Sequence, residues 1–300
     1  MAHMHRSNSM TTLRTMNAAV LTAPSVLRCR LCAALLRARP WGGAECADCG
    51  SVNVSELPSR AQLAAFYGRY AEQYTGGGRS EGRNLERYAR RYLARVQQTA
   101  KARRLIDVGS ARSPFPALAA QAGFEVTVMD LVPPPDLPAA VGFVEGSLDD
   151  DGPPAFGVGR FDVVCAWAVM EHLPRPLVGA RRLAALCAPG ARLHLSMPES
   201  GSFITDHAIG RSPWFYPPEH LHLLSAEAVI RAFERLGLRR VRAGRFELNP
   251  WRHALRYGAG YVEAGVGLLL KTTSPSAWER LRDTRRQIYA GIACFEFERP

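Results

Sequence analysis

The feature that most constrains the fold is a regular alternation of short apolar runs with helical segments between residues 104 and 198. Apolar strands separated by helices predict a parallel sheet with crossover connections, and ligands bind at the carboxyl ends of such strands. We therefore expect an α/β fold with a ligand crevice along one edge of the sheet. Five strands are predicted: Leu105–Val108, Glu125–Asp130, Val141–Val144, Phe161–Ala166 and Arg192–Ser196.

The last third of the chain continues this pattern less regularly. A helix is predicted from Leu177 to Leu186, ending before Pro189 and Gly190. Farther on, the sequence predicts a helix capped by Ser225 and ending at Gly237, and a short strand flanked by Val241 and Phe246. A largely helical insertion over 249–285, with a capping box at Ser276–Glu279, then precedes a last strand near Ile288–Glu298.

Four of the seven cysteines lie close together near the N-terminus, as two CxxC pairs. In such a pair the two thiolates can point at one ion, and two pairs complete a tetrahedron, so we expect a structural zinc ion held by Cys29, Cys32, Cys46 and Cys49. Two disulfides are disfavoured because no secretion signal is seen, and a redox CxxC is disfavoured by the second pair.

The segment between the cysteines and the first strand is expected to be helical. Apolar and aromatic residues recur at helical intervals over Arg60–Tyr74 and again over Asn84–Thr99, with a flexible glycine-rich stretch at Gly76–Gly82 between them. The predicted organisation is a disordered leader or tag over 1–25, a zinc ribbon over 26–55, a helical lid and linker over 56–103, and a catalytic domain over 104–300.

A cofactor site is predicted where the first two strands of the sheet end. Gly109 follows Asp107 and permits a tight turn that brings backbone close to a ligand, and Asp130 ends the next strand, where a carboxylate can bind both hydroxyls of a ribose. A dinucleotide dehydrogenase is disfavoured because the glycine triad of those enzymes is missing.

These residues resemble the first motif of class I S-adenosylmethionine (SAM)-dependent methyltransferases, although Ser110, Ala111 and Ser113 stand where glycines are frequent. Phe161–Pro174, with Glu-His-Leu at 171–173, and Leu186–Gly190 resemble the family's later motifs. The resemblance implies a Rossmann-like seven-stranded sheet and a SAM cofactor. It further implies cofactor contacts from Asp107, Gly109, Ser110, Ala111, Asp130, Leu131, Ser147, Leu148 and Trp167, with Asp149 as an alternative at the adenine.

Methyl transfer from the sulfonium needs an acceptor atom in line with the S–CH₃ bond and often a base. Candidates for this role lie in two places, Glu171–His172 and the segment Trp214–His222. A histidine, with an ordinary pKa near 6.5, suits proton removal. The alternatives are that Glu171 and His172 cap the following helix, and that His220 and His222 only close a loop.

The second segment resembles the Glu-His-Leu run of deoxysugar C-methyltransferases, which also begin with a four-cysteine zinc ribbon. This resemblance implies that Glu219 and His220 are catalytic, with Glu171 and His172 nearby. The chain departs from that family in lacking room for a further C-terminal domain and in having Leu224 before Ser225. Predicted substrate contacts, which could equally be packing residues, are Tyr67, Tyr70, Tyr74, Trp214, Tyr216 and His222.

The sequence carries a formal net charge of +11, and only two of its 38 basic residues are lysines. Scattered arginines are typical of solvated helix faces, so the charge alone does not indicate nucleic acid. We expect a cytoplasmic enzyme without a membrane segment that methylates an oxygen or carbon of a small molecule in natural-product or glycan biosynthesis; a homodimer is compatible with the sequence. The alternatives are an rRNA or tRNA base methyltransferase and a non-catalytic SAM-binding protein.

Overall fold

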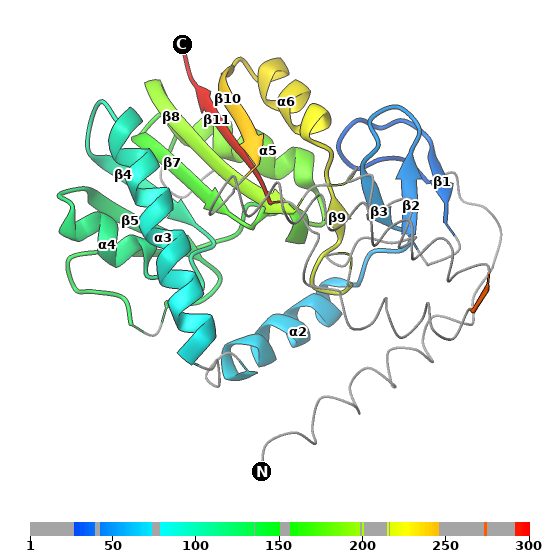
Figure 1. The fold of residues 1–300 in the computed structure, drawn as a ribbon, viewed down its shortest axis with the longest axis horizontal. Coiled ribbons are helices and arrows are strands. Elements are labelled where there is room, and N and C mark those ends of the chain that lie inside the picture. Colours follow the sequence, from blue (N-terminus) through cyan, green and yellow to red (C-terminus); the bar gives the residue numbers. More distant parts are fainter. Residues whose placement is uncertain are drawn as a thin grey trace.

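The computed structural model describes residues 27–39, 43–73, 79–134, 136–150, 157–198, 200, 215, 217–245, 273–274 and 292–300. These residues form a seven-stranded sheet covered by helices and a smaller four-stranded sheet beside it (Figure 1). No helix in these ranges is both long enough and apolar enough to cross a bilayer.

The large sheet has the strand order β10-β11-β8-β7-β4-β5-β6. The five strands from β8 to β6 in this order run parallel, whereas β11 is antiparallel to both of its neighbours. The predicted α/β sheet is therefore confirmed. Its strands are β4 (Arg104–Val108), β5 (Glu125–Asp130), β6 (Gly142–Glu145), β7 (Phe161–Trp167), β8 (Cys187–Pro198), β10 (Arg239–Arg245) and β11 (Ile292–Glu298).

Both faces of this sheet are buried, which explains the apolar runs in the sequence. Leu105 and Val163 pack with α3 (Arg79–Thr99) and α4 (Phe115–Gln121) on one face. The next residues along the same strands, Ile106 and Val164, pack on the other face with α5 (Pro176–Leu186) and α6 (Ala226–Arg235), because successive side chains of a strand point to opposite sides.

The predicted cap of α6 is confirmed: the Ser225 hydroxyl accepts a hydrogen bond from the backbone N–H of Ala228 at 3.2 Å. Two other details of the prediction were wrong. Helix α3 begins at Arg79, within the stretch expected to be flexible, because the surrounding Arg and Glu residues favour helix enough to outweigh Gly82. Strand β8 begins at Cys187, earlier than the predicted Arg192, because it starts directly where α5 ends, so Pro189 and Gly190 lie inside it at an irregularity in its pairing with β7.

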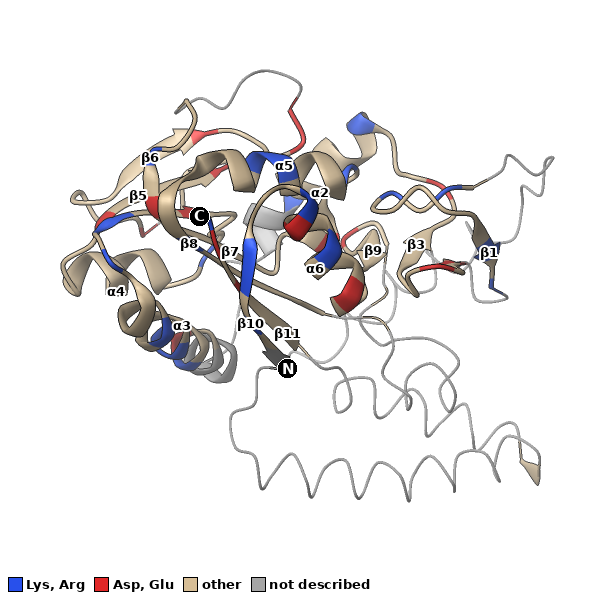
Figure 2. Cartoon of the chain, turned by 90° about the horizontal axis from the view of Figure 1, so that it is seen from above, with Lys and Arg blue, Asp and Glu red and all other residues tan. Residues whose placement is uncertain are grey.

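Several predicted elements cannot be followed. The helical insertion lies outside the described residues apart from Thr273 and Ser274, and so do the leader and residues 76–78 of the glycine-rich stretch. Charged residues of both signs are interspersed over the helices that are described (Figure 2). Among the basic residues, Arg95 and Arg192 pair with the buried carboxylate of Glu296 on β11, so part of the positive charge serves the packing of this sheet.

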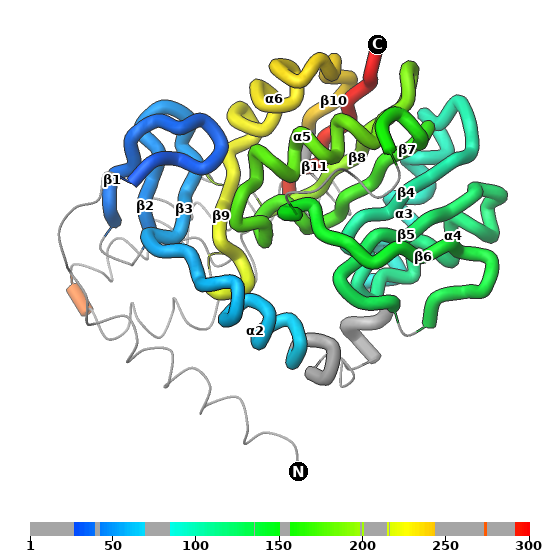
Figure 3. Tube along the Cα trace, turned by 180° about the vertical axis from the view of Figure 1, so that it is seen from behind, coloured from blue at the N-terminus to red at the C-terminus, as the bar shows by residue number. Residues whose placement is uncertain are grey.

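The small sheet contains the cysteine pairs and is completed by a strand from the distant part of the chain. Strands β1 (Leu36–Ala38), β2 (Gly43–Cys46) and β3 (Val52–Val54) are antiparallel, and β3 pairs in turn with β9 (His222–Leu223). Seen from behind, the four strands lie beside α6, and α2 (Arg60–Gln73) leads away from them (Figure 3). The cysteine module is thus joined by backbone hydrogen bonds to the segment that carries Glu219 and His220.

Candidate functional site

A tight turn follows β4 at the carboxyl edge of the sheet. Gly109 has φ +71°, and its N–H donates to the carbonyl of Met129 at 2.8 Å. A Cβ at this position would lie 2.7 Å from Cγ2 of Val169, so only glycine fits without displacing a neighbour. Ala111 also has a positive φ, +46°, at a position where relatives often have glycine. Both residues therefore adopt the left-handed backbone conformation that this tight turn requires.

Asp130, at the end of β5, holds this turn in place. One carboxylate oxygen accepts from the N–H of Ala111 at 2.8 Å, and the other from the N–H of Leu131 at 2.7 Å. Burial raises the pKa of Asp130, while these two N–H donors oppose the shift. Each carboxylate oxygen has lone-pair capacity left for a ribose hydroxyl. The side chain of Leu131 beside it is 46% exposed, which leaves apolar surface next to the carboxylate.

Asp107 lies beneath the same turn and is fully buried. One of its carboxylate oxygens accepts a hydrogen bond from the Ser110 hydroxyl, and the other has no partner. Burial raises the pKa of this carboxyl to about 7. An unpaired buried acceptor beside a glycine turn fits a ligand that brings a polar or cationic group to this place.

The loop after β6, predicted to contact adenine, is held by its own hydrogen bonds. The Ser147 hydroxyl accepts from the N–H of Asp149 at 3.0 Å, and Leu148 is buried. The carboxylate of Asp149 pairs with Arg175 at 3.1 Å, so this alternative residue is already engaged in an ion pair. Trp167, at the end of β7, stacks on Tyr92 with ring centroids 3.9 Å apart and is fixed by that contact.

The acid and base residues predicted after β7 and before β9 come together. Glu171 lies on the short 3-10 helix η2 (Met170–His172), and the N–H of Leu221 donates to its backbone carbonyl at 2.8 Å. The ring of His220 meets that of His172 edge to face, with centroids 4.7 Å apart. Nδ1 of His172 lies 2.9 Å from the backbone carbonyl of Glu219. We call Glu171, His172, Glu219 and His220 the acid–base cluster.

Burial dominates the electrostatics of this cluster. Glu171 is 0% exposed, and neither of its carboxylate oxygens has a hydrogen-bond partner among the residues that the structure describes. Its pKa is raised to about 8 by burial and, secondarily, by the charge of Glu219. The pKa of His172 is lowered to about 3 by burial and by the neighbouring His220. These groups therefore favour their neutral forms when nothing else is bound.

Among the predicted substrate residues, the described chain brings Tyr67 to the acid–base cluster: its hydroxyl lies 3.3 Å from Nδ1 of His172. His222 is fully buried and donates through Nε2 to the carbonyl of Leu173 at 2.9 Å, as the loop-closing alternative predicted. The side chain of Tyr70 and all of Tyr74, Trp214 and Tyr216 lie outside the described residues. The alternative that Glu171 and His172 cap α5 is wrong, since the N-cap of that helix is Arg175.

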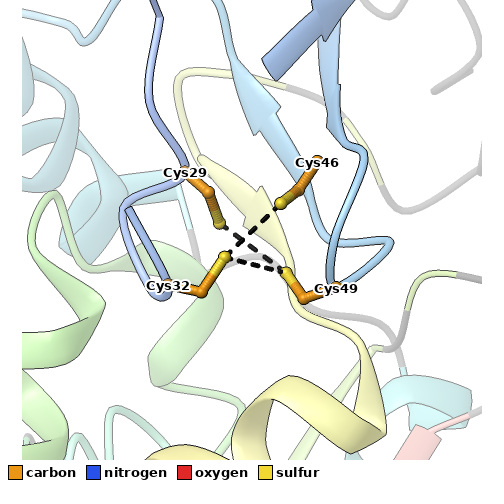
Figure 4. A group of neighbouring side chains, drawn as sticks. All are labelled: Cys29, Cys32, Cys46 and Cys49. Atoms are coloured by element: carbon orange, nitrogen blue, oxygen red, sulfur yellow. Dashed lines mark hydrogen bonds between the residues drawn. The ribbon is translucent and has the colours of Figure 1, made fainter. Parts of the chain in front are cut away.

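The four N-terminal cysteines converge on one point (Figure 4). Three Sγ–Sγ separations are 3.8 Å for Cys29–Cys49, 3.4 Å for Cys32–Cys46 and 3.6 Å for Cys32–Cys49, and all four thiols are free. An ion with four bonds of 2.3 Å to sulfur would hold the sulfurs about 3.8 Å apart. The arrangement fits a tetrahedral thiolate site and is far too open for disulfides.

Sequence reasoning missed the residues that connect this cysteine site to β9 and the start of α6. Asn53 is fully buried on β3, directs its amide toward Cys29 Sγ at 3.9 Å, and is paired in register with His222. Ser51 accepts from the backbone N–H of Ser225 at 3.0 Å. The available signal was a polar residue between two valines in a strand that is otherwise apolar, together with Ser51 directly before it.

The strand order, the turn at Gly109 and the carboxylate of Asp130 define a nucleoside-binding α/β fold of the class I methyltransferase type. The sequence model of the family described as "Methyltransferase domain" matches residues 82–243. The chain therefore belongs to this family of SAM-dependent methyltransferases, as the first resemblance implied. No curated protein sequence matches the chain.

Several solved structures are similar to this chain. The [4+2]-cyclase SpnF is 14% identical, with a TM-score of 0.51 over 83% of this chain and 98% of its own. A 1,6-didemethyltoxoflavin-N1-methyltransferase from Burkholderia thailandensis is 14% identical, with a TM-score of 0.49 over 84% and 97%. A SAM-dependent methyltransferase from Mesorhizobium loti is 15% identical, with a TM-score of 0.46 over 69% and 96%.

Replacing Gly109 by alanine is expected to weaken SAM binding at least about 10-fold. The new Cβ meets the stiff side chain of Val169 and the backbone must hold a positive φ, so the turn has to shift. Gly237→Ala is the matched control, because its φ is +84° but no atom lies within 4 Å of the added Cβ. Calorimetric titration with SAM measures both; equal affinities in the two variants would contradict the expectation.

Proposed function

We propose that the chain is a SAM-dependent methyltransferase that transfers a methyl group to an oxygen or carbon of a small-molecule acceptor, as in natural-product or glycan biosynthesis. The observation that carries the proposal is the position of the acid–base cluster. It combines the loops after β7 and before β9, and its residues share one buried region with Tyr67, whose pKa is raised by burial and by the charges of Glu219, Glu171 and Asp130.

In this proposal the cofactor occupies the edge formed by β4, β5 and β6. Gly109, Ser110 and Ala111 would hold the homocysteine part by close backbone approach, and Asp107 supports their turn. Asp130 would bind the ribose hydroxyls, with Leu131 against the nucleoside, and Ser147 and Leu148 would lie by the adenine. SAM supplies an electrophilic methyl group; Trp167 would border its methionine moiety through the stack that fixes the indole.

The chain's own contribution to the reaction is to orient the acceptor and take its proton. A base with a lone pair and a buried position removes a proton effectively because water does not compete for it. His220 and Glu219 are the candidates for this role, supported by His172 and Glu171 around them. Tyr67 is a candidate substrate contact because its hydroxyl lies beside His172, and Tyr70, Tyr74, Trp214, Tyr216 and His222 keep this role as predictions.

We further propose that the four cysteines bind one structural zinc ion. Four buried or half-buried thiols that occupy all corners of a tetrahedron leave no open position for a catalytic water. The domain organisation proposed from the sequence has a ribbon over 26–55, a helical segment over 56–103 and the methyltransferase domain after it. To this we add that the ribbon shares its sheet with β9 of the catalytic domain.

The test is methyl transfer from isotopically labelled SAM to fractionated small-molecule extracts, read by mass spectrometry of the products. The expected result is a labelled metabolite with the wild-type protein and none with Asp130→Ala, which should lose SAM affinity. Labelling of ribosomal or transfer RNA in place of a metabolite would favour the RNA alternative. SAM binding without a labelled product in any fraction would favour a non-catalytic SAM-binding protein.

A further inference from the structure

In the described structure, the carboxyl group of Glu171 is buried without the partners that such a group usually has. Its side chain is 0% exposed, and both carboxylate oxygens lack a hydrogen-bond partner. Burying an ionised carboxylate without compensation is so unfavourable that such groups are neutralised, paired or bound to a metal. Among the described residues, the imidazole of His172 lies close to it, with Nε2 4.0 Å from Glu171 Oε1.

The hydrogen bonds of His172 determine which ring nitrogen carries the proton. A carbonyl oxygen can only accept, so Nδ1, 2.9 Å from the Glu219 carbonyl, is the donor. In the neutral ring Nε2 then keeps a lone pair directed to the side where Glu171 lies. Histidine ligands of metals almost always show this pattern, in which the other nitrogen donates to a backbone carbonyl or a carboxylate.

His220 supplies a third donor atom at the same place. Its ring meets His172 edge to face, and one ligand atom from each of Glu171, His172 and His220 lies within 4.8 Å of the other two. The positions are held by backbone, since the N–H of Leu221 donates to the carbonyl of Glu171 at 2.8 Å. Bonds of about 2.1 Å from one ion can bridge a 4.0 Å separation such as that between Glu171 and His172.

We infer that Glu171, His172 and His220 form a second metal site, which binds a divalent transition metal ion separately from the four cysteines. Two imidazoles and one carboxylate suit zinc, iron and related ions, and three protein ligands leave coordination positions open. The positive charge of the ion compensates the negative charge of the buried Glu171 carboxylate. Glu219 is not one of the three residues whose ligand atoms converge.

The site also narrows the acceptor, a step that rests on the proposed methyltransferase function. Open positions on such an ion favour an acceptor with two neighbouring oxygens, such as a vicinal diol, a catechol or a hydroxyl beside a carbonyl. The hydroxyl proton passes to the Glu219 carboxylate, and the oxygen forms a bond to the methyl carbon. The C–S bond breaks with its electron pair left on sulfur, giving a methyl ether and S-adenosylhomocysteine. The inference therefore selects O-methylation.

The direct test counts metal ions on the full chain. Protein whose cysteine site is loaded with one zinc is titrated with cobalt(II), which absorbs strongly in the near ultraviolet when thiolates bind it and lacks that band with nitrogen and oxygen ligands. We expect one further equivalent of cobalt without the thiolate band. Glu171→Gln and His220→Ala should each lower the affinity for this ion at least about 100-fold, whereas the matched variant Glu219→Gln should retain it.

Thermal stability guards against variants that merely misfold. Because Glu171→Gln keeps the shape of the side chain and replaces a buried carboxyl group by a neutral amide, its metal-free form should melt near the wild-type temperature or above, and cobalt should no longer raise that temperature. The inference is overturned if the wild type takes up no second ion, or if Glu171→Gln and His220→Ala take it up as the wild type does.

The failure of this inference and of the proposed function can be told apart. Methyl transfer that is undiminished in protein with one zinc and no second ion overturns the metal site and leaves the methyltransferase. A second ion bound at these three residues in a protein that transfers no methyl group from SAM overturns the proposed function alone. A methylated carbon in the product overturns the proposed diol-type acceptor.

Discussion

A His220→Ala protein is expected to bind SAM with nearly wild-type affinity and to transfer the methyl group at least about 100-fold more slowly. The side chain lies in the acid–base cluster, 5% exposed and edge to face with His172. It can act there as the base or as a metal ligand, and positioned proton transfer contributes about 100-fold to 10,000-fold to rate. In the proposed arrangement SAM binds elsewhere, at the turn after β4. Calorimetry and single-turnover kinetics separate the two quantities.

The Asp130→Ala variant is expected to affect SAM binding and to leave the acid–base cluster intact. It removes the carboxylate that holds the N–H groups of Ala111 and Leu131, so SAM affinity should fall while the acid–base cluster stays intact. Unchanged turnover in His220→Ala would remove this residue from the reaction. Equal losses of SAM affinity in both variants would mean that His220 supports the cofactor site and not the acceptor site.

A Cys29→Ser protein is expected to lose its zinc and, with it, the order of the small sheet. Structural zinc contributes on the order of 10 kcal/mol to the folding of small zinc domains. Without the ion, Cys46 and Cys49 would remain as buried thiols and Cys32 as a half-buried one, and we expect β3 to be held less firmly against β9. Turnover should therefore fall as well, because β9 begins two residues after His220. Zinc content per chain, melting temperature and protease cleavage within residues 43–54 measure the effects.

Cys294→Ser is the control for this variant. Cys294 lies on β11, away from the other cysteines and only partly buried, so its serine variant should keep about one zinc per chain and an intact small sheet. Retention of zinc and stability in Cys29→Ser would refute the zinc site.

The fold could be predicted from the sequence because its determinants are local. Apolar strands buried on both faces produce continuous apolar runs, and Ser225 and Gly237 mark the ends of α6 by their own side-chain and backbone chemistry. The glycine turn and Asp130 were found in the same way, since each needs a particular residue type at one position. The sequence also predicted that the loops carrying Glu171, His172 and His220 lie on the same edge of the sheet.

The remaining features depend on contacts between distant segments, which no local pattern encodes. The missing partner of Glu171, the proton position on His172 and the amide of Asn53 beside Cys29 become visible only when three loops are placed in space. Helix α3 was predicted to start too late because Gly82 was given more weight than the helix formers around it. The stack of Trp167, at the end of β7, on Tyr92 of α3 is a further contact of this kind.

The pairing of β3 with β9 also bears on how the protein folds. Ser51 and Ser225, which flank this pairing, are 174 positions apart in the sequence, and contacts of such separation form late because the intervening loop must close first. The cysteine module and the large sheet can each gain structure from nearby residues, but the strand after His220 has to wait for both. We expect the acid–base cluster to be the last part of the protein to reach its native arrangement, so refolding should recover secondary structure before it recovers activity.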